Sequence, residues 1–209
     1  MTEAKPNLQS INSLIQQRRA ALAAMRSGVK ERKQASEGGI ACCQWMSDQV
    51  DEFLRGIVAQ QLEMRPQVSP TSFAVLAVGG NGRRRPAPFS DIDLLFLMET
   101  KQQTAAQDFL STVVRDCWDA GAQPGSSIRT ISDVVRFAGE DIQFATSLIE
   151  TRFLCGNEKL AETALQQVRS KVFKDRSEPM IERLVASRRE EWMTRGNSVN
   201  QLEPDLKRS

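Results

Sequence analysis

The sequence predicts an α+β fold, in which a small mixed β-sheet core is flanked by N-terminal and C-terminal helices. Short apolar runs bounded by glycine, proline and polar residues are concentrated in the middle of the chain, and such runs are typical of buried strands. Longer segments with apolar residues at helical spacing lie on both sides. We therefore divide the chain into a helical region over 1–65, a core over 66–135 and a second helical region over 136–209.

The first region is expected to form two helices. Residues 7–35 carry leucine and isoleucine at helical spacing in an Ala-, Gln- and Arg-rich segment. A break at 36–39 separates them from a second helix over 42–62, where Trp45, Phe53 and other apolar residues share one face. This pattern predicts a pair of amphipathic helices ahead of the core.

The core is expected to contain three strands and one helix. The apolar run over 72–78 predicts the first strand, and a turn region over 81–90, rich in Gly, Pro and Arg, follows it. Residues 92–98 form the second predicted strand. A helix with an apolar stripe is expected over 101–120, and a third strand over 126–131.

The last region is expected to be helical. Its predicted helices cover 133–152, 157–174 and 179–194. Pro179 suits the first turn of the last helix, where its missing N–H costs nothing. Residues 200–209 are polar and are expected to be irregular.

The charge balance gives no sign of a nucleic-acid or membrane partner. The 209 residues include 28 basic and 26 acidic ones, a net charge of +2, which provides no strong field for a polyanion. No apolar run approaches the roughly 20 residues of a membrane helix, and the N-terminus lacks the pattern of a secretory signal. We expect a cytoplasmic protein that binds no DNA, RNA or membrane.

Several kinds of chemistry are excluded by residue types that the chain lacks. It has no histidine, which removes Ser–His and Cys–His catalysis and histidine-bound metals. It has no tyrosine, so it is not its own tyrosine substrate. The four cysteines show no C-x-x-C spacing and are expected to be reduced thiols. Trp45, Trp118 and Trp192 are expected to pack in the core.

Two aspartates at the start of the second predicted strand are the clearest candidates for chemistry. Asp91 and Asp93 are one residue apart, so on a strand they project to the same side. Neighbouring carboxylates repel one another unless a cation lies between them. Mg²⁺ prefers oxygen ligands and is held by one or two carboxylates together with substrate phosphates. The pair therefore predicts a metal–nucleotide site.

The residues before this pair suit a nucleotide phosphate. Gly79 and Gly80 end the first predicted strand, where the missing side chains let backbone N–H groups approach a phosphate. Ser90 offers a hydroxyl donor. Arg83 and Arg84 offer guanidinium groups that bind two phosphate oxygens at once. Each of these residues also has a purely structural interpretation, as a turn or surface residue.

The segment 77–97, AVGGNGRRRPAPFSDIDLLFL, resembles the active-site segment of the PII uridylyltransferase family. Its glycine pair, spacer and Asp-x-Asp resemble the signature of the polymerase-β-like nucleotidyltransferase superfamily. Three further segments, 125–130, 151–157 and 202–207, are similar to motifs of the same family and follow in the same order. The resemblance covers nearly the whole chain from about residue 45.

This resemblance implies a polymerase-β-like nucleotidyltransferase core that transfers UMP from UTP to a tyrosine of a PII-type nitrogen-regulatory protein. It implies that Asp91 and Asp93 are catalytic and hold Mg²⁺ or Mn²⁺ on the triphosphate. Family members continue past the motif at 202–207 into an HD domain that removes UMP and ACT domains that sense glutamine. We expect this chain to lack both of those functions.

The chain departs from the family pattern at several positions. Asn81 stands where the family has an aromatic residue, and Arg85 where it has a glutamate. Ser126 replaces a histidine. Related transferases place a third carboxylate on a later strand, but the strand over 126–131 offers none, and Asp133 is expected to cap the next helix.

These departures leave two alternatives to an active uridylyltransferase. One is a truncated, catalytically impaired remnant that binds only a nucleotide or a partner protein. The other is an active transferase of the same fold that uses another nucleotide or another acceptor, because the contacts that select the base are not identifiable in the sequence.

Overall fold

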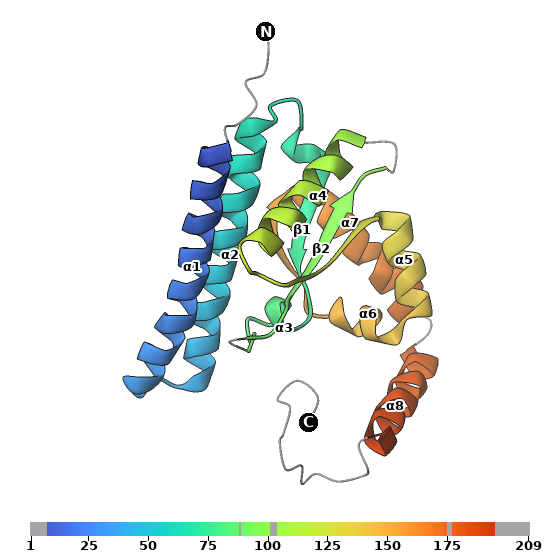
Figure 1. Ribbon diagram of the computed structural model, residues 1–209. Helices are drawn as coiled ribbons and strands as arrows, with labels where there is room; N and C mark the ends of the chain where they lie inside the picture. The colour runs from blue at the N-terminus through green and yellow to red at the C-terminus, as the bar shows by residue number, and fades with distance from the viewer. Residues whose placement is uncertain (1–7, 88, 101–103, 175–176, 195–209) are drawn as a thin grey trace.

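A computed structural model describes residues 8–87, 89–100, 104–174 and 177–194. In these residues a four-stranded sheet lies between two groups of helices, with α1, α2 and α4 on one side and α5, α6 and α7 on the other (Figure 1). The predicted α+β class, with a small mixed sheet flanked by helices, is confirmed.

The sheet has the strand order β3-β2-β1-β4. Its strands are β1 (Phe73–Ala77), β2 (Ile92–Met98), β3 (Pro124–Thr130) and β4 (Arg152–Gly156). β1 runs antiparallel to both β2 and β4, whereas β2 and β3 are parallel. The parallel pair is possible because α4 provides the crossover connection that parallel neighbours need.

The helices follow the hydrophobic pattern of the sequence. Their bounds are α1 Leu8–Gln34, α2 Gly39–Met64, α3 Gly79–Gly82, α4 Thr104–Asp119, α5 Ile131–Glu140, α6 Ile142–Ser147, α7 Glu158–Val168 and α8 Ser177–Thr194, with a 3₁₀ turn η1 at Pro70–Ser72 and a π-turn η2 at Arg169–Phe173. The two predicted N-terminal helices and the helix before the third strand are confirmed within a few residues at each end.

Alternate strand residues fill two separate hydrophobic clusters, one on each face of the sheet. Phe73 of β1 and Phe96 of β2 pack with α1, α2 and α4. Leu76 and Leu95 pack on the opposite face with α5, α6 and α7. These four side chains are almost fully buried. Because neighbouring strand residues point to opposite faces, Asp93 lies on the face of α5, α6 and α7.

One predicted helix, over 133–152, is wrong. The structure has two short helices there, α5 and α6, followed by the strand β4. Asp141 ends the first helix and caps the second, since its carboxylate accepts hydrogen bonds from the backbone N–H groups of Gln143 and Phe144. β4 was missed because its strand character comes from pairing with β1 rather than from local sequence.

Two further predictions, on Asp133 and on the tryptophans, are tested by the structure. Asp133 forms a capping box with Thr130 at the start of α5, as expected for a helix cap. The expectation that all three tryptophans pack in the core is wrong, because Trp118 is 54% and Trp192 51% exposed. The division at 65/66 and 135/136 stays a prediction, and the segments 200–209 and 202–207 lie outside the described residues.

No helix in the described parts of the chain is long and apolar enough to cross a membrane.

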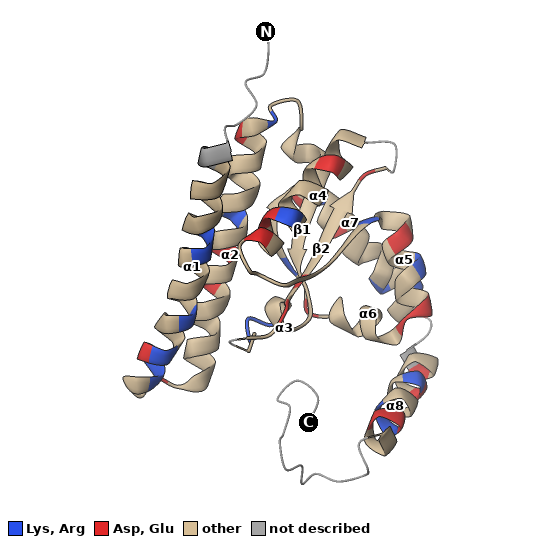
Figure 2. Ribbon diagram, viewed as in Figure 1, with Lys and Arg blue, Asp and Glu red and all other residues tan. Residues whose placement is uncertain are grey.

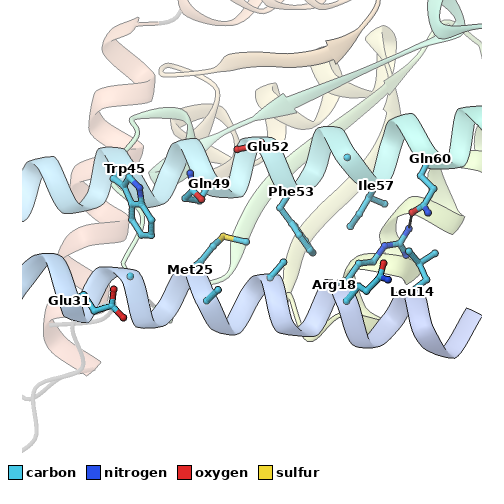
Figure 3. A pocket seen from close by; sticks show the side chains of 15 residues that line it. Leu14, Arg18, Met25, Glu31, Trp45, Gln49, Glu52, Phe53, Ile57 and Gln60 are labelled. Atoms are coloured by element: carbon cyan, nitrogen blue, oxygen red, sulfur yellow. Dashed lines mark hydrogen bonds between the residues drawn. The ribbon is translucent and has the colours of Figure 1, made fainter.

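An open groove of about 750 Å³ runs between α1 and α2 (Figure 3). Small residues, among them Ala21, Ala24 and Gly28 of α1, line it together with Trp45 and Phe53 of α2. The groove contains none of the residues predicted for the metal–nucleotide site, which lies at one end of the sheet.

Candidate active site

The two predicted metal ligands lie at the start of β2. Asp91 precedes the strand by one residue and Asp93 is its second residue, and both are half-buried. Gly125 of β3 is paired with Asp93 across the parallel ladder. The edge strand β3 therefore runs alongside the carboxylate pair without placing a side chain beside Asp93.

Two glycines flank the Asp93 carboxylate. A Cβ atom added to Gly79 would lie 3.1 Å from Oδ2, and one added to Gly125 would lie 3.1 Å from Oδ1. Gly79 also has φ +56°, a conformation that favours glycine. A side chain on either glycine would therefore crowd the Asp93 carboxylate.

The glycine turn α3 connects β1 to the loop before β2. Its N-cap residue, Val78, makes no side-chain hydrogen bond to the turn, and the Val78 N–H donates to the Asp93 carbonyl over 3.1 Å. A Cβ on Gly80 would meet only the Arg85 carbonyl oxygen, 3.9 Å away, an ordinary contact. Packing within the chain therefore explains a glycine at position 79 but not at position 80.

The donor set suits a hard divalent cation. Two half-buried carboxylates one residue apart supply the oxygen ligands that Mg²⁺ prefers, and the two glycines beside Asp93 add no side chain that would crowd its carboxylate. Among the described residues, no group of three or more His, Cys, Asp and Glu side chains could hold a metal ion. Phosphate oxygens and water would therefore have to complete the coordination shell.

The polar residues predicted to contact phosphate interact with the protein itself. Arg83 lies 3.4 Å from the Glu150 carboxylate, and Arg84 forms an ion pair with Asp48 of α2. The Ser90 hydroxyl donates to a loop carbonyl 3.0 Å away. Figure 2 shows the basic loop after α3 at the same end of the sheet as the start of β2. Phosphate binding by these three residues stays a prediction.

The basic side chain of Arg129 lies on the Asp93 face of the sheet. Ser127 and Arg129 follow Gly125 at alternate positions of β3, and the Arg129 Nε donates to the Ser127 hydroxyl over 3.1 Å. The Arg129 guanidinium lies 3.7 Å from the ring centre of Phe137 and 5.0 Å from that of Phe144. These contacts give Arg129 a structural role between β3, α5 and α6.

The sequence reasoning assigned no role to Arg152, which reaches the glycine turn from β4. Its guanidinium forms an ion pair with Asp51 of α2 and donates to the backbone carbonyls of Asn81 and Gly82. Asp51 is only 4% exposed although it lies in the middle of an amphipathic helix. An acid among the core-facing positions of a helix indicates a basic partner, and this position of Asp51 was the one signal that the sequence offered.

The sheet, the glycine turn and the aspartate pair together define the class: a small nucleotidyltransferase-type core flanked by helices. No family model matches the chain. It is 31% identical over 211 residues to the bifunctional uridylyltransferase/uridylyl-removing enzyme of Phenylobacterium zucineum, a match that covers 96% of this chain and 22% of that enzyme.

Enzymes of the same name show similar agreement in other bacteria. The identity is 31% over 201 residues for Azospirillum brasilense, with 93% of this chain and 21% of the enzyme covered. It is 35% over 147 residues for Ruegeria pomeroyi, with 69% and 16% covered. The chain therefore belongs to the uridylyltransferase/uridylyl-removing enzyme family, and it spans about a fifth of the length of these curated relatives.

Proposed function

We propose that this chain is a metal-dependent nucleotidyltransferase that moves UMP from UTP to a tyrosine of a PII-type signalling protein. The observation that carries the proposal is the pair Asp91 and Asp93 beside the glycine turn, in a chain whose relatives are named for uridylyl transfer. In the reaction, the tyrosine oxygen forms a bond to the α-phosphorus of UTP. The bond from that phosphorus to the bridging oxygen breaks, pyrophosphate leaves with the electron pair, and the phenolic proton passes to solvent.

Each residue of the site has a definite task in this proposal. Asp91 and Asp93 would hold Mg²⁺ or Mn²⁺, which supplies positive charge to the triphosphate oxygens when bound. Packing within the chain does not explain why position 80 is a glycine. In this proposal Gly80 would let a phosphate approach the backbone of the turn. Gly79 would avoid the crowding of the Asp93 carboxylate that a side chain at this position would cause.

The test is label transfer from α-³²P-UTP to a purified PII protein in the presence of Mg²⁺ or Mn²⁺. We expect Asp91→Asn and Asp93→Asn each to lower the transfer rate at least about a hundredfold, because each would remove a charged ligand of the metal ion that neutralises the reacting phosphates. Asp108→Asn is the matched control, since Asp108 is an exposed acid on α4. Equal rates in all four proteins would contradict the proposal.

One observation favours the alternative, an impaired transferase that only binds a nucleotide or a partner. Arg83 and Arg84 lie beside Glu150 and Asp48, and their positive charge is partly neutralised before any triphosphate arrives. A binding measurement with UTP and Mg²⁺, made beside the transfer assay, decides between the two. Metal-dependent binding of UTP without transfer of label would support the remnant. If ATP were the better donor in the transfer assay, the chain would be a transferase with another base preference.

A further inference from the structure

The Arg152 guanidinium makes polar contacts with four residues around the candidate site. Its two Nη atoms lie 2.5 Å and 3.0 Å from the two carboxylate oxygens of Asp51, and Nη2 also lies 3.1 Å from the Ser47 hydroxyl. Nη2 donates to the Asn81 carbonyl over 3.0 Å, and Nε donates to the Gly82 carbonyl over 3.2 Å. One guanidinium thus joins α2 to the end of the glycine turn.

This arrangement holds the turn from the side opposite the aspartates. Arg152 is paired with Ala77 in the β1–β4 ladder, and Ala77 faces the cluster of α1, α2 and α4. Asp93 lies on the other face, and its carbonyl accepts a hydrogen bond over 3.1 Å from the N–H of Val78, the N-cap residue of the turn. The turn α3 is therefore held at its N-cap by β2 and at its last two residues by Arg152.

The chemistry of the contacts requires an arginine. The two carbonyl groups and the Asp51 carboxylate lie in different directions around a planar group with five N–H donors. A lysine ammonium has three donors at one point and cannot reach all of these acceptors in the same geometry. Asp51 is almost fully buried and fixes the guanidinium by a two-point contact.

We infer that Arg152 is a positioning residue that fixes the glycine turn Gly79–Gly82 in the conformation needed to receive a nucleotide triphosphate. Its effect on the nucleotide is exerted through the backbone of the turn, and this part of the inference rests on the proposed function. Its effect on the turn itself is independent of any ligand. The two parts are therefore measured separately.

The first measurement is amide hydrogen exchange in the protein without nucleotide. The N–H groups of Gly82, Arg83 and Arg85 donate to carbonyl groups at 3.0–3.1 Å within the turn, so their exchange rates report its opening. We expect Arg152→Lys to accelerate their exchange at least about tenfold relative to amides of β2, because charged hydrogen bonds to the turn are lost. Lysine keeps a cation beside Asp51 and so preserves the buried charge balance.

Arg55→Gln is the matched control. The Arg55 Nε donates to the Leu154 carbonyl over 3.0 Å, so this arginine also links α2 with β4 but does not touch the turn. We expect no acceleration in this variant. Unchanged exchange in Arg152→Lys, equal acceleration in Arg55→Gln, or an Arg152→Lys chain that does not fold would each overturn the inference.

The second measurement separates nucleotide binding from metal binding. For Arg152→Lys we expect the affinity for UTP with Mg²⁺ to fall about tenfold, whereas the affinity for Mn²⁺ alone, measured by electron paramagnetic resonance, stays within about twofold. A residue needed only for general stability would change both or neither. Failure of the wild-type chain to bind UTP would reject the proposed function, and the exchange rates would still decide whether Arg152 fixes the turn.

Discussion

Some glycines near the site occupy positions where an added side chain would crowd neighbouring atoms. Gly82 is the most constrained of them, since an added Cβ would lie 1.8 Å from the Glu150 carbonyl oxygen and 3.2 Å from that of Ala77. Two backbone segments therefore approach the end of the turn as closely as a residue without a side chain allows. Gly79 and Gly125 are limited instead by the Asp93 carboxylate.

We expect Gly82→Ala to lower the free energy of unfolding by at least about 2 kcal/mol, because overpacking against backbone cannot be relieved by a rotamer change. Gly139→Ala is the control, since Gly139 lies in α5 with open space around it, and alanine there should stabilise the helix by up to about 1 kcal/mol. Urea denaturation of the three proteins checks both values. A Gly82→Ala protein as stable as wild type would contradict this account of the turn.

At the level of elements, a buried polar network joins α1, α2 and α4. Arg18 of α1 lies 2.8 Å from the Asp116 carboxylate of α4 and donates to Gln60 of α2 over 2.8 Å. The Gln61 side chain donates to Asp116 over 2.5 Å. Arg18 and Asp116 are both buried, so either charge alone would be poorly solvated in the folded state.

Asp116→Asn should therefore lower the free energy of unfolding by about 3 kcal/mol, because it leaves the Arg18 charge buried without its counter-ion. Glu140→Gln removes an ion pair to Arg136 on the surface of α5, where both side chains are more than half exposed, and should cost less than about 1 kcal/mol. Equal losses in the two variants, measured by urea denaturation, would show that burial does not strengthen the α1–α4 contact.

For the whole molecule, two buried thiols make the free energy of unfolding depend on pH in the alkaline range. Burial, with a smaller contribution from Asp116 and opposed by Arg18, raises the pKa of Cys117 from 9.0 to about 12. Burial also raises the pKa of Cys155 to about 11, against the effect of Arg55. The unfolded chain ionises these thiols from about pH 9 upward while the folded chain does not, so the free energy of unfolding falls as pH rises above 9.

For Cys117 the loss approaches about 1.4 kcal/mol for each pH unit between 9 and 12. The chain has no tyrosine, so no phenol titrates in the same range. Urea denaturation between pH 8 and pH 10.5 should give a shallower decline for Cys117→Ala than for the wild type. Parallel curves for the two proteins would rule out the coupling at this thiol.

Several features of this protein were determined by local sequence. Apolar residues at helical spacing predicted the two N-terminal helices, and a nearly continuous apolar run predicted the strand β2. Each occurs in the structure close to its predicted bounds. The capping role of Asp133 also follows from sequence, because a capping box involves residues three apart. The expectation that Asp91 and Asp93 project to the same side uses only the two-residue period of a strand, and it stays a prediction, since Asp91 lies one residue before β2.

Other features were decided only by tertiary structure, because they depend on residues far apart in the chain. β4 is a strand because β1 offers it a hydrogen-bonding edge, whereas the sequence predicted a helix up to residue 152 and no strand after it. Gly125 meets Asp93 only through the parallel pairing of β3 with β2. The Arg152–Asp51 contact spans 101 positions, and no local pattern shows which buried acid an arginine will reach. Local periodicity fixes which residues face the core, whereas long-range backbone pairing and buried charge decide which of them meet.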